Sequence, residues 1–192
     1  MIYTTVLNNC YRDTFVNLPN LRKLNLNHNN ITIVHDKAFK LLGSLQELEL
    51  SNNQISVITR DMFYGLRNLK RLNLRGNRIS LLGERSFVEM SELTELELDQ
   101  NQIILIRERA FDNMRNLQRL QLNDNQLTSL PPNFLAGAPG INFLDLRDNF
   151  LKTVTFDNVK PIMTNLYEIN GYLYLSGKYL YRLLFLIKLA SI

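Results

Sequence analysis

The chain has 192 residues, of which 45% are hydrophobic and 21% charged, so its composition is that of a folded protein and not of a disordered one. The net charge of +4 does not indicate a nucleic-acid binder, because residues 173–192 hold three basic and no acidic residues while the rest has 19 basic against 18 acidic. Basic residues form no stripe interleaved with aromatics, and we therefore expect no nucleic-acid partner.

Residues 1–20 are predicted to form a partial N-terminal repeat. Leu7, Cys10, Phe15 and Leu18 have the spacing of apolar positions that recur later in the chain. The single cysteine, Cys10, stands where its later counterparts are Val, Ile and Leu, so we expect a small buried hydrophobe and not a reactive thiol or metal ligand. One cysteine also excludes an internal disulfide and a cysteine-based zinc site.

Residues 21–164 contain six consecutive repeats of 24 residues, seen for example in LTELELDQNQI at 93–103. With Leu21 as the first place, leucine fills the fourth and sixth places of every repeat. The apolar–polar alternation around these leucines predicts a short strand with one buried face. One repeat cannot bury enough apolar surface to fold alone, so we expect the units to stack into a solenoid.

An asparagine at the ninth place follows each predicted strand. Its amide has both donors and an acceptor, so we expect it to bond backbone groups where the chain turns. A phenylalanine at the nineteenth place is expected to pack between neighbouring repeats; in the fifth repeat Leu135 takes this place with Phe134 beside it. The predicted asparagine ladder consists of Asn29, Asn53, Asn77, Asn101, Asn125 and Asn149.

Residues 165–192 are predicted to be a degenerate repeat or the approach to a C-terminal cap. Four leucines restore the register, with Lys178 in the asparagine place: Leu173, Leu175, Leu180 and Leu183. The tail also allows an interfacial membrane helix, although unrelated residues at a truncated end explain it more simply. We expect membrane contact solely through parts of a longer protein.

Candidate catalytic and metal-binding residues are sparse. His28 and His35 lie seven residues apart with no cysteine or carboxylate at metal-ligand spacing, so we expect solvated surface histidines. Paired carboxylates such as Glu95 and Glu97 are expected on the exposed face of a strand, where no apolar pocket raises one pKa above the other. We therefore expect no enzymatic activity, no cofactor and no metal.

The pattern L-x-x-L-x-L-x-x-N-x-I with a later Phe resembles the 24-residue variant of the leucine-rich repeat family, over about residues 4–164. The resemblance implies an α/β fold, a curved horseshoe solenoid with a parallel β-sheet on the concave face and irregular loops and short helical turns on the convex face. This variant is similar to that of animal cell-surface and secreted receptors and adhesion proteins, which usually flank the repeats with cysteine-rich caps. Neither cap is present here, so we expect a fragment of a longer protein.

The third, fifth and seventh places of the repeat are not part of the predicted core. The residues at the third place alternate in charge between neighbouring strands, which lie about 4.8 Å apart. Two interpretations remain open: a self-satisfied charge ladder, or a surface whose charges engage a protein partner. Phe143 and Phe150, expected to be exposed, are either binding anchors or contacts to a C-terminal cap. The candidate surface on the concave face comprises Lys23, Glu47, Glu49, Arg71, Arg75, Glu95, Glu97, Asp99, Arg119, Phe143 and Arg147.

The function most consistent with these features is non-catalytic protein–protein recognition by part of an extracellular or cell-surface receptor or adhesion protein. Its partner would be a protein ligand or co-receptor on the concave face. The triplet Asn30-Ile31-Thr32 makes Asn30 a candidate glycosylation site. The alternative is an intracellular, cytoplasmic leucine-rich repeat scaffold or regulatory subunit, which the low cysteine content favours.

Overall fold

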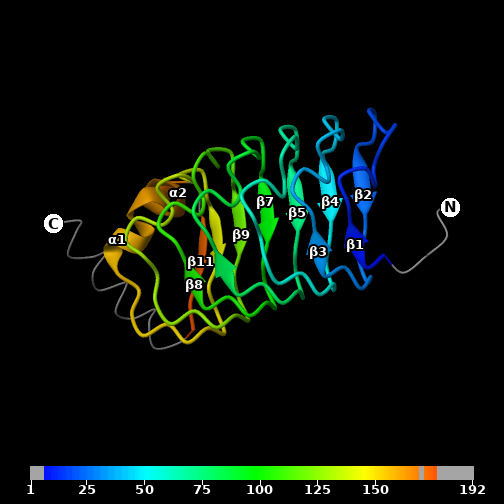
Figure 1. Ribbon diagram of the computed structural model, residues 1–192. Helices are drawn as coiled ribbons and strands as arrows, with labels where there is room; N and C mark the ends of the chain where they lie inside the picture. The colour runs from blue at the N-terminus through cyan, green and yellow to red at the C-terminus, as the bar shows by residue number, and fades with distance from the viewer. Residues whose placement is uncertain (1–6, 169–170, 177–192) are drawn as a thin grey trace.

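A computed structural model describes residues 7–168 and 171–176, and within them seven short parallel strands form the principal sheet. Figure 1 shows the strands of this sheet side by side in a solenoid whose turns are stacked from the N-terminal to the C-terminal end. Lys178, Leu180 and Leu183 lie outside the described residues. The strands, in spatial order, are β2 (Lys23–Asn25), β4 (Glu47–Glu49), β5 (Arg71–Asn73), β7 (Glu95–Glu97), β9 (Arg119–Gln121), β10 (Phe143–Asp145) and β11 (Tyr172–Tyr174).

The register of the sheet follows the repeat in the sequence. Leu24 pairs with Leu48, and the same relation holds for each following pair up to Leu144. Leu144 then pairs with Leu173, so the last step is longer than the others. The additional residues lie in α1 (Phe156–Val159), η1 (Lys160–Ile162) and α2 (Met163–Glu168), at the C-terminal end of the stack in Figure 1.

Two smaller parallel sheets lie on the opposite side of the turns and were not predicted from the sequence. β1 (Asn9–Cys10) pairs with β3 (Ile33–Val34), and β6 (Leu81–Leu82) pairs with β8 (Leu105–Ile106). Each has two residues per strand, too few to show an alternating pattern. The predicted solenoid with a parallel sheet on one face is confirmed, and between these short strands the convex side consists largely of turns.

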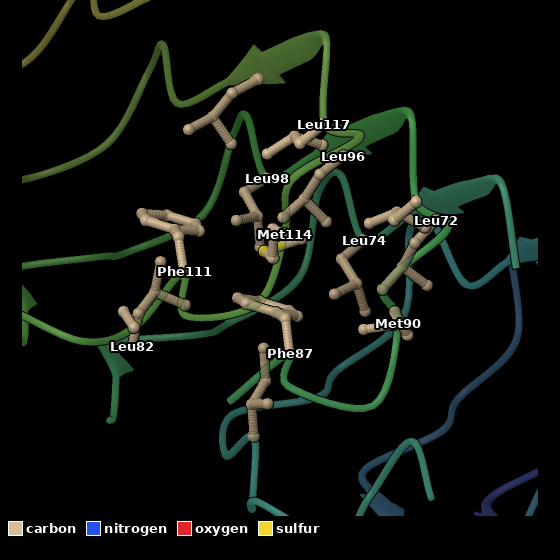
Figure 2. Close-up of a cluster of buried hydrophobic side chains, with 14 of the residues drawn as sticks. Leu72, Leu74, Leu82, Phe87, Met90, Leu96, Leu98, Phe111, Met114 and Leu117 are labelled. Carbon is tan, nitrogen blue, oxygen red and sulfur yellow. The ribbon is translucent and has the colours of Figure 1, made fainter. Parts of the chain in front are cut away.

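The core runs along the inside of the solenoid between the two faces. Leu72 and Leu96 in β5 and β7, and Leu74 and Leu98 directly after these strands, point inward in Figure 2 and are fully or almost fully buried. Every second residue of a strand is therefore a leucine that packs against the turn before and after it. This burial, at about 1.5–3 kcal/mol for each fully buried leucine, provides the main stabilisation of the stack.

Phenylalanine rings form a second column through the core. Phe87 lies 6.1 Å from Phe63 and 6.0 Å from Phe111, measured between ring centroids, and all three are buried. Figure 2 shows Phe87 and Phe111 in this column. In the fifth repeat Phe134 continues the column, with its ring edge-on to Phe111, although Leu135 has the nineteenth place in the sequence and is itself buried.

The N-terminal turn departs from the predicted pattern at one position. Cys10 is fully buried, as its place in the repeat predicts, and burial raises the pKa of its thiol to about 12. Leu18, by contrast, is 41% exposed, whereas its counterpart Leu42 is fully buried. The turn that carries Leu18 stands at the end of the described stack and packs against a neighbour on one side.

The ladder asparagines bond the backbones of consecutive turns. Asn101 Nδ2 donates to the carbonyl of Leu98 in its own turn at 3.1 Å and to that of Leu74 in the preceding turn at 3.0 Å. Asn101 Oδ1 accepts the backbone N–H of Ile79 at 3.1 Å. The same arrangement occurs at Asn53, Asn77, Asn125 and Asn149, and Asn29 accepts the N–H of Leu7.

Candidate functional site: the charged face of the sheet

The solvent side of the seven-stranded sheet, which we call the concave face, presents the side chains of the third, fifth and seventh places. They alternate with the buried leucines, so each strand places two side chains on this face and the second residue after the strand contributes a third. The candidate residues predicted from the sequence are thereby brought onto one continuous surface.

Third-place charges pair across neighbouring strands. Lys23 Nζ lies 2.6 Å from Glu47 Oε2, and Arg71 Nε lies 3.0 Å from Glu95 Oε2. The hydrogen bond and charge of Lys23 lower the pKa of Glu47, and Glu47 raises the pKa of Lys23. The cationic side chains remain about half exposed or more, so a partner could reach them without unfolding the sheet.

The fifth-place carboxylates of Glu49 and Glu97 differ in the hydrogen bonds that they accept. Glu49 accepts hydrogen bonds from the Nδ2 atoms of Asn27 at 3.2 Å and Asn73 at 3.0 Å. Glu97 is half-buried, and among the described residues no group donates to its carboxylate or forms an ion pair with it. Burial raises the pKa of Glu97, and the negative charges of Asp99 and Glu49 add to the increase.

Two acidic residues of this face are buried, and Glu95 and Glu97, which were expected to be exposed, are half-buried. Asp99 is 4% exposed and Asp145 2%, because each lies between the strands or strand ends of adjacent turns. Asp145 Oδ2 is 2.6 Å from Arg147 Nη2, which neutralises it. Asp99 Oδ2 is 3.3 Å from Arg75 Nε, and burial raises the Asp99 pKa although Arg75 acts in the opposite direction.

An aromatic cluster closes the C-terminal end of the face. Phe143 was expected to be exposed, but it is half-buried, with the Arg119 guanidinium 3.6 Å above its ring and Tyr174 5.4 Å away. Tyr172 and Tyr174, stacked at 6.1 Å, were missed, although the YLY alternation of 172–174 matches the third to fifth places of a repeat. Phe150 lies away from this cluster and is 69% exposed.

The remaining candidates lie apart from the charged face. His28 is exposed in the turn three residues after β2, with a left-handed φ of 55°, and His35 stacks on Tyr11 at 4.9 Å. Asn30 is exposed, and its Oδ1 accepts a hydrogen bond from Gln54 Nε2 at 3.0 Å.

Residues 7–168 and 171–176 contain neither a metal-binding cluster nor a membrane-spanning helix. Three histidine, cysteine or acidic side chains nowhere meet in a way that could hold a metal ion. In the same residues no helix has the length and apolar character needed to cross a bilayer.

Comparison with known proteins identifies the class to which this solenoid belongs. The family described as "Leucine rich repeat" matches residues 7–55, 43–103 and 91–151. The matches together cover most of the chain, and the chain therefore belongs to the leucine-rich repeat family.

One similar protein is a receptor by name, and another is a chain from the structure of a TLR13–ssRNA13 complex. Leucine-rich repeat-containing G-protein coupled receptor 5 of Rattus norvegicus is 54% identical over 43 residues, which are 22% of this chain and 5% of the receptor. A chain in a crystal structure of a TLR13–ssRNA13 complex is 30% identical, with a TM-score of 0.69 over 72% of this chain and 20% of that chain. The chain thus spans a small part of the length of these relatives.

Proposed function

We propose that the chain is a non-catalytic recognition segment of a cell-surface or secreted receptor or adhesion protein, and that it binds a protein ligand or co-receptor on its concave face. The observation that carries this proposal is the charged third-place column, in which Lys23, Glu47, Arg71 and Glu95 form neighbouring pairs on a rigid sheet. Such pairs can exchange internal partners for those of a ligand with little change in the fold.

The comparisons support a receptor context. The rat relative is a G-protein coupled receptor by name, and repeat solenoids use their extended surfaces for binding. The exposed sequon at Asn30 agrees with an extracellular location, because a glycan there would project away from the core.

A protein ligand is favoured over a nucleic acid for this face. The TLR13 structure is a complex with single-stranded RNA, whereas the centre of this concave face carries the carboxylates of Glu49, Glu97 and Asp99. Phosphate groups would meet these carboxylates with like-charge repulsion, and nucleic-acid affinity depends chiefly on basic side chains. A single-stranded RNA oligonucleotide should therefore show no saturable binding at 150 mM salt.

A matched pair of variants tests the proposal. The biotinylated 192-residue chain would be screened against an array of secreted and cell-surface proteins, alongside Arg71→Gln on the concave face and Arg67→Gln as the control. Arg67 is exposed and lies outside the strands, so both variants remove one positive charge from the surface. The proposal predicts a protein whose dissociation constant rises about tenfold with Arg71→Gln, as expected for the loss of about 1.4 kcal/mol of binding energy, and stays unchanged with Arg67→Gln. Partners that respond to Arg67→Gln and ignore Arg71→Gln would contradict it.

A further inference from the structure

Two buried oxygen atoms at the centre of the concave face have no hydrogen-bond donor among the described residues. They are Oδ1 of Asp99 and Oδ1 of Asn123. The two residues occupy the seventh place of consecutive repeats, and the backbone N–H of Gln100 donates to the carbonyl of Asn123 at 3.1 Å. The two side chains therefore start from adjacent turns about 4.8 Å apart.

Both residues are otherwise engaged in a way that leaves these oxygens free. Asn123 Nδ2 donates to Asp124 Oδ2 at 2.8 Å, so its oxygen is the unpaired end of the amide. Arg75 reaches Asp99 through Oδ2, and its Nε also lies 3.2 Å from Gln100 Oε1. Arg75 is about half exposed and shared between two acceptors, which makes it a partial counterion for Asp99.

The electrostatic surroundings are acidic. Glu97 has no donor among the described residues, and Asp124 adds a further negative charge beside Asn123. The carboxylates of Glu97, Asp99 and Asp124 thus outnumber the guanidinium of Arg75. Burial raises the pKa of both Glu97 and Asp99, and neighbouring carboxylates add to the increase, whereas Arg75 lowers the Asp99 pKa.

We propose that this acidic site between Asp99 and Asn123 receives a lysine side chain of the protein ligand, an inference that rests on the proposed function of the concave face. An ammonium group has three donors, and Asp99 Oδ1 and Asn123 Oδ1 are two unpaired acceptors on adjacent turns. It would also supply the positive charge that Arg75 supplies in part. A buried charge of this kind binds well when its hydrogen bonds and charge partner are both present.

The geometry favours an ammonium over the alternatives. An ammonium is compact and donates in three directions, whereas a guanidinium is wider and planar. A divalent cation would need several oxygen ligands, and in the described residues no three acidic or histidine side chains converge for a metal.

The test uses an acetylated, amidated tetralysine peptide as the probe, with the tetra(acetyl-lysine) peptide as a neutral control and tetra-arginine for comparison. Binding to the 192-residue chain would be followed by the NMR shifts of the Asn123 side-chain amide and the Gln100 backbone amide. We expect saturable shifts with tetralysine, weaker shifts with tetra-arginine, and none with the neutral peptide. Absence of tetralysine shifts would overturn the inference.

Three variants locate the binding. Asp99→Asn should weaken tetralysine binding at least tenfold, while Asp157→Asn, a matched change at an exposed residue of α1, should leave it unchanged. Arg75→Gln should strengthen binding several-fold, because it removes the competing cation without removing the acceptors. Unchanged or weaker binding by Arg75→Gln, or equal effects of the two aspartate variants, would refute the site even if Asp99→Asn proved poorly folded.

The outcome separates this inference from the proposed function. A protein partner that is sensitive to Arg71→Gln but indifferent to Asp99→Asn would refute the lysine site and leave the concave-face proposal intact. If tetralysine binding depends on Asp99 but the protein partners bind elsewhere, the site binds cations and the proposed function is refuted. Stronger Asn123 shifts with calcium than with tetralysine would identify a metal site and overturn the lysine assignment.

Discussion

The backbone N–H of Ile79 donates to Oδ1 of Asn101, 22 residues later and one turn further along the solenoid, at 3.1 Å. The same amide donates back to the carbonyl of Leu74 in the turn of Ile79. A single side chain therefore satisfies a buried donor and a buried acceptor of its neighbour, and this link repeats at every interface of the ladder. The regular stacking of the sheet depends on it.

Replacing Asn101 by leucine should lower the free energy of unfolding by about 2–6 kcal/mol. Leucine is similar in size, but it leaves the buried Ile79 N–H without a partner, at about 1–3 kcal/mol. The carbonyls of Leu74 and Leu98 each lose one hydrogen bond, at about 0.5–1.5 kcal/mol, and keep the one from Asn77 or Asn125. Urea unfolding followed by circular dichroism would measure the change. The exposed neighbour of a ladder residue, Asn30, provides the control: Asn30→Ala should change stability by less than about 0.5 kcal/mol. Equal stability of Asn101→Leu and wild type would refute the structural role of the ladder.

Phe87→Ala should cost about 3–5 kcal/mol, because the ring is buried between Phe63 and Phe111 and its removal leaves a cavity in the column. Phe150→Ala removes an exposed ring and should be nearly neutral. Thermal denaturation of the two variants makes the comparison. A similar loss in both would show that the phenylalanine column is not a principal source of stability.

The double variant Glu97→Gln, Asp99→Asn removes two carboxylates whose charge is unfavourable in the folded chain, and it should raise the free energy of unfolding at pH 7. Both groups have a raised pKa in the folded chain. The folded state therefore holds protons that the unfolded state has already released, and stability falls as pH rises from the unfolded-state pKa, about 3.9–4.3, to the folded-state pKa. The stabilisation should be present at pH 7 and disappear near pH 3, where both groups are protonated in both states.

Urea midpoints measured from pH 3 to pH 7 would test this sign, with Glu108→Gln, an exposed residue outside the strands, as the control. A double variant that is less stable than wild type at pH 7 would show that these carboxylates are structural. The combination of higher stability and lost lysine binding is the result expected of residues kept for binding.

Production of the chain through a eukaryotic secretory pathway should add one N-linked glycan at Asn30. The side chain is exposed, and the sequon is completed by Thr32. Intact mass before and after peptide N-glycosidase treatment measures the occupancy. Asn30→Gln and Thr32→Ala should each abolish the glycan, and a secreted chain of unmodified mass would contradict the assignment.

Most of the fold follows from the repeat in the sequence. The fixed spacing of leucine and asparagine leads directly to the strand pairs, because a stack of equal turns places equivalent residues side by side, as in Leu24 with Leu48 and Leu72 with Leu96. The longer step from Leu144 to Leu173 depends on how 13 residues fold into α1, η1 and α2, which the repeat does not specify.

The chemistry of the concave face was less predictable. Alternation identifies which residues leave the core, but their burial depends on the length and direction of neighbouring side chains. Asp99 is buried and Phe143 half-buried because neighbouring side chains cover them. The repeat pattern does not show which neighbouring side chains will cover a given residue. The unpaired oxygens of Asp99 and Asn123 depend in the same way on contacts made by Arg75 and Asp124.

Hydrogen–deuterium exchange on the chain, with and without the protein partner returned by the array screen, tests the central claim most directly. Binding on the concave face predicts that protection increases in β4, β5, β7 and β9, with little change in β3, β6 and β8 on the other side of the turns. Protection confined to β3, β6 and β8 would place the partner on the convex side and contradict the account.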